Sequence, residues 1–271
     1  MGFFMNFSRP GRGVSKEEAA KRNYFDILGR HFFDLVKLNL LYVGCNIIFI
    51  AAAVFFIMPY YFEIDAVLDR LIFDQNTLLP ILPFIPFMFM GPFTAGFTFV
   101  LRNWSRQEHA FLVSDFLEHS KKNWKQALCL SALSTVVCYL FLTAVIFYLK
   151  TVAFKGLVIT LSLIIAVILL GMNIYTYPML VTFDMKLLDI LKNALIFTLS
   201  KLPQSLFFLV VIGAVHVLLL WYVPFAWVIL MITILIAWSG FTAIYYAWHV
   251  IDTYMMPKAE ENNEQVFDDA I

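Results

Sequence analysis

His216 is the only histidine placed deep within one of the long apolar stretches of this sequence. An ionisable side chain in such a setting is a functional candidate by default, because charging it away from water is costly. No charged partner is evident for it, whereas Asn46, Asn173 and several hydroxyl groups are neutral candidates. We therefore expect a neutral, hydrogen-bonded imidazole. A place along a solute pathway is the alternative interpretation.

Motifs that would indicate an enzyme are missing. The sequence contains no HExxH, no GxSxG, no phosphate-binding loop and no Asp/Glu pair inside an apolar stretch. Cys45, Cys129 and Cys138 lie in apolar runs without a metal-ligand spacing, which favours small buried hydrophobes. We therefore predict no catalytic, cofactor or metal site, no enzymatic activity and no nucleic-acid partner.

Proline and small residues concentrate between residues 80 and 96. Proline frees backbone carbonyls and kinks helices, while small residues four apart let another helix approach closely. Gly91 and Ala95 have this spacing, Pro92 and Gly96 lie beside them, and Thr94 could bond across helices. Tight packing is the favoured interpretation, and a hinge or pathway is the alternative. Packing is also expected at the four-residue repeat of Ser239, Ala243 and Ala247.

The elements that must position these residues are membrane spans. Apolar residues make up 62% of the chain and charged residues 14%, against about 25% charged in soluble domains. Lipid is the solvent that removes the need for a charged surface. Six stretches are long enough to cross the bilayer. We place them at residues 36–58, 78–101, 126–148, 157–180, 204–222 and 224–248.

Lysine and arginine predict the orientation, because cytoplasmic loops carry an excess of them. With six spans and both termini in the cytoplasm, sixteen of the nineteen fall on the cytoplasmic side. Arg70, Lys150 and Lys155 remain outside. We therefore expect a multi-pass protein with one membrane domain, 1–256. Residues 257–271 are rich in Asp and Glu and are predicted to form a disordered cytoplasmic tail.

Three charged segments on that side read as amphipathic helices in the membrane interface, at 21–36, 106–125 and 184–202. In the first, Arg22, Asp26, Arg30 and Asp34 suggest a ladder of ion pairs. The apolar faces of the first two are expected to be Phe25, Leu28, Phe32 and Val36, and then Val113, Phe116, Leu117 and Trp124. Each helix followed by two spans suggests a threefold repeat, with units at 21–104, 105–182 and 183–256.

Short motifs along nearly the whole chain resemble the YesL-like family of uncharacterised bacterial membrane proteins. The motifs that carry the resemblance are Gly91-Pro92-Phe93-Thr94-Ala95-Gly96, Leu101-Arg102-Asn103, Ser114-Asp115-Phe116, Lys122-Asn123-Trp124-Lys125-Gln126, Tyr177-Pro178-Met179, Thr182-Phe183-Asp184 and Asp189-Ile190-Leu191-Lys192-Asn193-Ala194. The resemblance implies a bacterial cell membrane location. It also implies a gene neighbourhood of carbohydrate ABC importers and sensor kinases.

Three functions follow from these observations. The first is an accessory or regulatory partner of a carbohydrate ABC importer, or of a membrane signalling protein. The second is an independent transporter or channel for a small solute, and the third is a membrane enzyme, ranked last. The positions to test first for contact with a partner are Arg102, Asn103, Asp115, Trp124, Asp184 and Asn193. Their structural alternatives include Arg102 capping the second span and Trp124 anchoring at the headgroups.

Overall fold

The computed structural model describes residues 23–61 and 79–256, and all regular structure in these ranges is helical. The predicted acidic tail, Arg22 and Arg70 lie outside the described residues. Within the described ranges the chain is an all-α membrane protein, as predicted.

Up to six candidate membrane spans follow one another along the described chain. Five continuous spans are long and apolar enough to cross a bilayer. They are α3 (Phe32–Tyr61), α8 (Trp124–Thr151), α9 (Lys155–Thr182), α11 (Leu202–Tyr222) and the run of α12 (Pro224–Leu230), η2 (Met231–Leu235) and α13 (Ile236–Met255).

The remaining crossing is broken. It comprises η1 (Leu79–Phe84), α5 (Ile85–Met88) and α6 (Gly91–Ser105), and its two halves meet at an angle of 48°. This is the segment in which proline clusters, so the kink has the expected cause. Val223 is the non-helical residue between α11 and α12, which agrees with two separate crossings on either side of Pro224.

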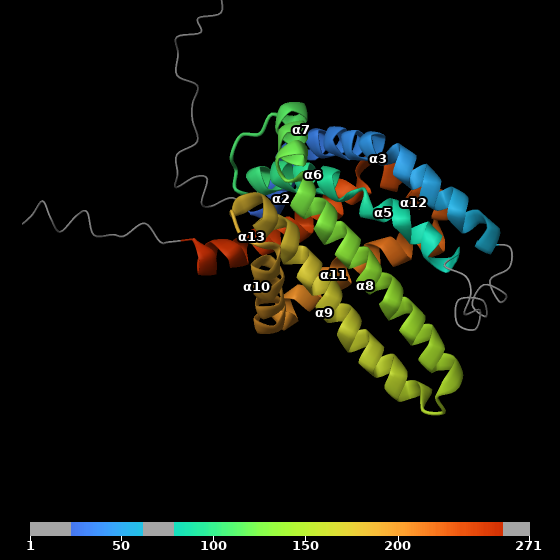
Figure 1. The fold of residues 1–271 in the computed structure, drawn as a ribbon. Coiled ribbons are helices and arrows are strands. Elements are labelled where there is room, and N and C mark those ends of the chain that lie inside the picture. Colours follow the sequence, from blue (N-terminus) through green and yellow to red (C-terminus); the bar gives the residue numbers. More distant parts are fainter. Residues whose placement is uncertain (1–22, 62–78, 257–271) are drawn as a thin grey trace, which may run out of the picture.

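Three short helices each precede a pair of spans. They are α2 (Tyr24–Arg30), α7 (Leu112–Lys122) and α10 (Leu187–Ser200). In Figure 1 these helices gather around α6 and the end of α13, while α8 and α9 run side by side as a long hairpin that extends away from them. The order of one short helix and two spans therefore occurs three times, as the sequence predicted.

The core lies at the end of the bundle that carries the short helices. One cluster of buried side chains is centred on Tyr175, Met179 and Ala247, from α9 and α13. The other is centred on Leu38, Phe97 and Phe241 and joins α3 to α6 and α13. Only 6% to 28% of the residues in the apolar windows of the spans are buried. The rest of the span surface faces outward, where lipid replaces water as the solvent.

The predicted ion-pair ladder of residues 21–36 is wrong at its step from Arg30 to Asp34, and Arg22 lies outside the described residues. The helix ends at Arg30, and His31 forms a turn before α3 begins. Because this turn resets the helical phase, Asp34 pairs with Lys37 at 2.9 Å instead of with Arg30. The inward face holds Ile27 and Leu35, whereas Phe25 is 78% exposed.

Two further expectations need correction. Residues 106–111 precede α7 as a turn, with Gln107 at a φ of 58°, so the helix is shorter than the predicted segment 106–125. Cys129 and Cys138 are exposed on the surface of α8 rather than buried. An apolar stretch that crosses a membrane is apolar on all sides, so hydropathy alone does not show which side faces protein.

Candidate functional site

Two glycines of the broken span set the positions of its neighbours. A Cβ added at Gly96 would collide with the Phe116 carbonyl oxygen and with Ser120 of α7, and one at Gly91 would collide with Ala127 and Ser131 of α8. Contacts this close leave no room for any side chain. The glycines therefore hold α7 and the start of α8 directly against α6, as small residues do at membrane helix contacts.

The start of α6 is fixed by hydroxyl groups. Pro92 is the second residue of the helix, where its missing N–H costs nothing. Thr94 donates from Oγ1 to the Met90 carbonyl at 2.9 Å and lies 3.0 Å from the hydroxyl of Tyr42 on α3. Ser131 donates to the Met88 carbonyl, which lies at the break. Carbonyls freed by the kink thus find partners inside the protein, as the bilayer requires.

Arg102 is the most heavily bonded side chain at the other end of α6. Its Nη1 donates to the Val181 carbonyl oxygen and to Thr182 Oγ1, both at 3.0 Å. Its Nε and Nη2 donate to Asn103 Oδ1 at 3.2 and 2.8 Å, and the group lies over the ring of Phe99. Only 7% of the residue is exposed.

The expectation that Arg102 caps the second span is therefore wrong. It caps the fourth, because Val181 and Thr182 form the last turn of α9. The carbonyl end of a helix carries partial negative charge, which favours a cation there. The turn is reinforced by Thr182, whose hydroxyl donates to the carbonyl of buried Pro178 at 2.6 Å. Arg102 thus ties α6 to α9 through oxygen atoms that carry no formal charge.

Beside this contact lies an open polar cavity of about 620 Å³, here called the basic cleft. It is bounded by the end of α7, the start of α8 and the end of α9. Its lining residues are His119, Lys121, Lys122, Asn123, Trp124, Lys125, Gln126, Leu180, Val181, Thr182, Phe183 and Asp184. Two sequence-predicted positions, Trp124 and Asp184, line it, and Arg102 forms hydrogen bonds to Val181 and Thr182 of its α9 wall.

The other two predicted polar positions have local partners. Asp115 accepts from the backbone N–H of Phe111 at 2.8 Å and so closes the start of α7. The amide of Asn193 makes a long contact of 4.0 Å with Met185 Sδ, and the Met185 carbonyl accepts from Gln126 at 3.1 Å. Asn193 therefore lies near the cleft without lining it.

His119 was not singled out from the sequence, although it forms one wall of the cleft. Its ring stacks on Phe99 with centroids 3.3 Å apart and planes 12° apart. Burial lowers the pKa of this imidazole below its ordinary value, an effect that Glu118 opposes and Lys122 and Arg102 reinforce. A neutral ring stacked on an aromatic side chain is consistent with this shift. The only sequence feature that could have indicated this cleft is the cluster of Lys121, Lys122 and Lys125.

His216, in the fifth span α11, is held by two hydrogen bonds to the last span. Trp227 donates from Nε1 to His216 Nδ1 at 3.2 Å, and His216 Nε2 lies 2.9 Å from Ser239 Oγ. An indole N–H only donates, so Nδ1 is unprotonated and the ring proton sits on Nε2, facing the serine. The hydroxyl partner belongs to the class expected from the sequence, whereas Trp227 was not foreseen. The pair joins α11 to α12 and α13.

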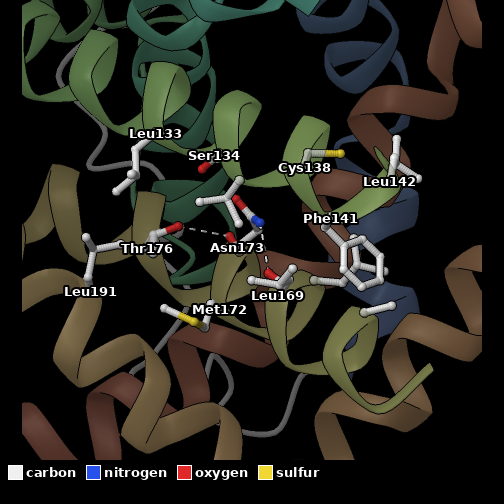
Figure 2. Close-up of a pocket in the computed structure, with 13 residues that line it drawn as sticks. Leu133, Ser134, Cys138, Phe141, Leu142, Leu169, Met172, Asn173, Thr176 and Leu191 are labelled. Carbon is white, nitrogen blue, oxygen red and sulfur yellow. Dashed lines mark hydrogen bonds between the residues drawn. The ribbon is translucent and has the colours of Figure 1, made fainter. Parts of the chain in front are cut away.

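Two small cavities are lined in part by α8 and α9. The midspan pocket, about 260 Å³, adjoins the break in the second span and is lined by Tyr42, Phe87, Met90, Gly91, Thr94, Ser131, Ser134, Thr135, Asn173 and Tyr177. The apolar pocket, about 340 Å³, lies between α8 and α9 and is capped by Leu191 of α10 (Figure 2). Ser134 and Asn173 line both. These polar residues lie in separate spans, so no spacing in the sequence predicts that they line one pocket.

Asn39 is a structural residue that sequence reasoning missed. Its amide donates to the carbonyls of Met231 and Ile232 at 2.9 and 2.7 Å, and its Oδ1 accepts from the N–H of Ala237 at 2.7 Å. The two carbonyls belong to η2, a π-helical turn in which regular bonding is interrupted, and the N–H of Ala237 follows it. Asn39 is completely buried and so fastens α3 to the last span.

The fold and these contacts define a class, the polytopic all-α membrane protein with an internally bonded polar end. Among the described residues no group of three or more His, Cys, Asp or Glu side chains is placed to hold a metal.

Over residues 35–145 the chain is similar to a family described as a protein of unknown function, DUF624. The match runs from α3 into the last third of α8 and includes Gly91, Gly96, Arg102 and Trp124. No curated protein and no solved structure matches the chain.

Proposed function

We propose that this protein is an accessory or regulatory membrane subunit that binds a partner through the end of the bundle formed by α2, α7 and α10. The partner we propose is a carbohydrate ABC importer or a membrane signalling protein that works with it. The orientation in this proposal places both termini in the cytoplasm of a bacterium, because the lysine and arginine residues concentrate on that side.

The observation that carries the proposal is that polar and close contacts fix the short helices at one end of the bundle. Buried Arg102 joins α6 to α9, and Gly96 seats α7 directly on α6. These contacts fix helices whose outer surfaces remain charged and exposed, with Glu118 on α7 and Asp189 and Lys192 on α10. A rigid, charge-patterned surface suits the recognition of a partner, since complementary charge selects partners and speeds encounter.

The identity of the partner rests on a narrower inference. We take the matched family of unknown function to be the YesL-like family, on the motifs around Gly91, Arg102, Trp124 and Asn193. For that family the neighbouring genes suggest carbohydrate import. Gene neighbourhood is an association, so it supports the choice of partner and supplies no mechanism.

A second candidate function, an independent small-solute transporter, is favoured by the midspan pocket. Transporters place substrates near the middle of the bilayer, beside helices that are broken there. The second span is broken next to this pocket, and hydroxyl and amide groups from four spans line it, among them Tyr42, Thr94, Ser131 and Asn173.

The experiment that separates the two uses charge reversal at exposed positions. Glu118→Lys on α7 and Lys192→Glu on α10 should reduce recovery of an importer subunit in a pull-down from cross-linked native membranes. Lys155→Glu, at the far end of α9, is the matched control and should leave recovery unchanged. Uptake of complex carbohydrate is measured in a deletion strain that carries each variant. Unchanged uptake on deletion, with no importer subunit recovered, would remove the proposal and favour the transporter.

A further inference from the structure

We propose that the basic cleft binds the phosphate headgroup of an anionic phospholipid. This inference is independent of the partner proposed above, because it concerns a cavity whose walls all belong to this chain. Its volume of about 620 Å³ falls in the range of small-molecule sites, about 300–1,000 Å³.

Charge is the first reason. Lys121 and Lys122 end α7 and Lys125 lies in the first turn of α8, so the turn at Asn123 brings three lysines to the lining of one cavity. Asp184 is the one acidic residue among its lining residues. On the α9 wall, the Val181 carbonyl and the Thr182 hydroxyl already accept from the Arg102 guanidinium. The cleft therefore offers a net positive surface to a phosphate group.

Position favours a lipid as the source of that phosphate. The cleft opens where α8 begins and α9 ends, which are the ends of two candidate membrane spans. Trp124, which is 49% exposed, stands at its rim, and indole rings favour the headgroup level of a membrane. Leu180 and Phe183 add apolar wall that a free inorganic anion would not use.

The surface next to the cleft is apolar, as the acyl chains of a bound phospholipid require. The apolar pocket of Figure 2 lies on the same two helices and begins at Leu133, seven residues beyond Gln126 along α8. Seven helical residues span about 10 Å. An acyl chain that leaves the cleft and follows α8 and α9 therefore meets apolar side chains. Basic pockets between spans are recognised sites for anionic headgroups.

The test measures lipid selectivity of the purified full-length protein. Native mass spectrometry counts lipids retained from an equimolar mixture of phosphatidylglycerol and phosphatidylcholine, and thermal unfolding in detergent is followed with each lipid or with inorganic phosphate. Replacing all three cleft lysines with glutamine (K121Q/K122Q/K125Q) should reduce the preference for phosphatidylglycerol about tenfold or more, since each lysine near an anionic surface contributes several-fold. Retention of phosphatidylcholine should not change.

The control variant K155Q/K186Q/K192Q removes the same charge outside the cleft and should keep the preference. Equal loss in both triple variants would contradict the proposal, because net charge rather than the cleft would then explain the binding. Absence of any preference for phosphatidylglycerol in the unaltered protein would also overturn it. So would stabilisation by inorganic phosphate that matches stabilisation by the lipid, since the ligand would then be a free anion.

Discussion

At the scale of single residues, buried polar groups decide how the spans are joined. The neutral, hydrogen-bonded state of His216 could be predicted from sequence, because no charged side chain lies near it in the chain. Its bond to Trp227 and the bond of Arg102 to Val181 could not, since the partners are eleven and 79 residues away in sequence. Local sequence suggested instead that Arg102 caps its own helix. Long-range partners of this kind appear only when helices pack.

Asn39→Leu should destabilise the protein by about 1–3 kcal/mol for the backbone groups left unpaired. The substitution keeps the volume similar but removes bonds to two carbonyls and one N–H around η2. Thermal unfolding in detergent measures the loss. Asn193→Leu is the matched control, because its amide makes only the long contact to Met185. Equal effects of the two variants would show that Asn39 does not fasten α3 to the last span.

The stability of the folded protein should fall as pH drops below about 6.5, with His119 as one contributor. Burial lowers its pKa from 6.5 in the fold, so the unfolded chain binds the proton first. The stabilising contribution is therefore complete above that pH and is lost on acidification. Burial also lowers the pKa of His31, so part of the slope will remain in any variant of His119 alone.

His119→Phe keeps a ring that can stack on Phe99 and removes the titrating group. Melting temperatures recorded between about pH 7.5 and about pH 5 should fall less steeply in this variant than in the unaltered protein. The two proteins are compared first at the upper pH, where the imidazole is neutral. An unchanged slope would mean that protonation of His119 is not coupled to unfolding.

At the scale of elements, the sequence identified the spans well and the short helices less well. Span positions follow from hydropathy, and the bend in the second span follows from its prolines. The turn at His31 and the loop before Leu112 were missed, because the charge spacing around them also fits a continuous helix. The contact of α7 with α6 was missed as well. The sequence marked Gly96 as a small residue that permits close packing, but it does not show which helix packs there.

Gly96→Ala should destabilise the bundle by about 1–3 kcal/mol, the usual cost of forcing extra volume into a packed contact. The new methyl group would push against the Phe116 carbonyl and so separate α7 from α6. Gly44→Ala on α3 provides the control, because a Cβ there meets no atom within 4 Å. It should be neutral or slightly stabilising, as alanine favours helix over glycine. Equal losses in thermal unfolding would exclude close packing as the reason for glycine at position 96.

At the scale of the whole molecule, the helices form a packed, polar end and an apolar hairpin that extends from it. The core and the polar contacts lie at the end formed by α2, α7 and α10, and the α8–α9 hairpin extends away from it with an apolar surface (Figure 1). The order of short helix, span and span could be predicted from sequence. How α6, α9 and α13 meet could not, because every span is apolar around its whole circumference.

The most direct test of this account is the labelling of single cysteines in a cysteine-free chain by a membrane-impermeant reagent. Lys121→Cys on α7 and Leu188→Cys on α10 are exposed at the charged end, and Lys155→Cys is exposed at the opposite end of α9. The account predicts that the cysteine at 155 reacts in intact cells, and that those at 121 and 188 react only after permeabilisation. Labelling at 121 or 188 from outside would contradict the six-span arrangement with a cytoplasmic charged end.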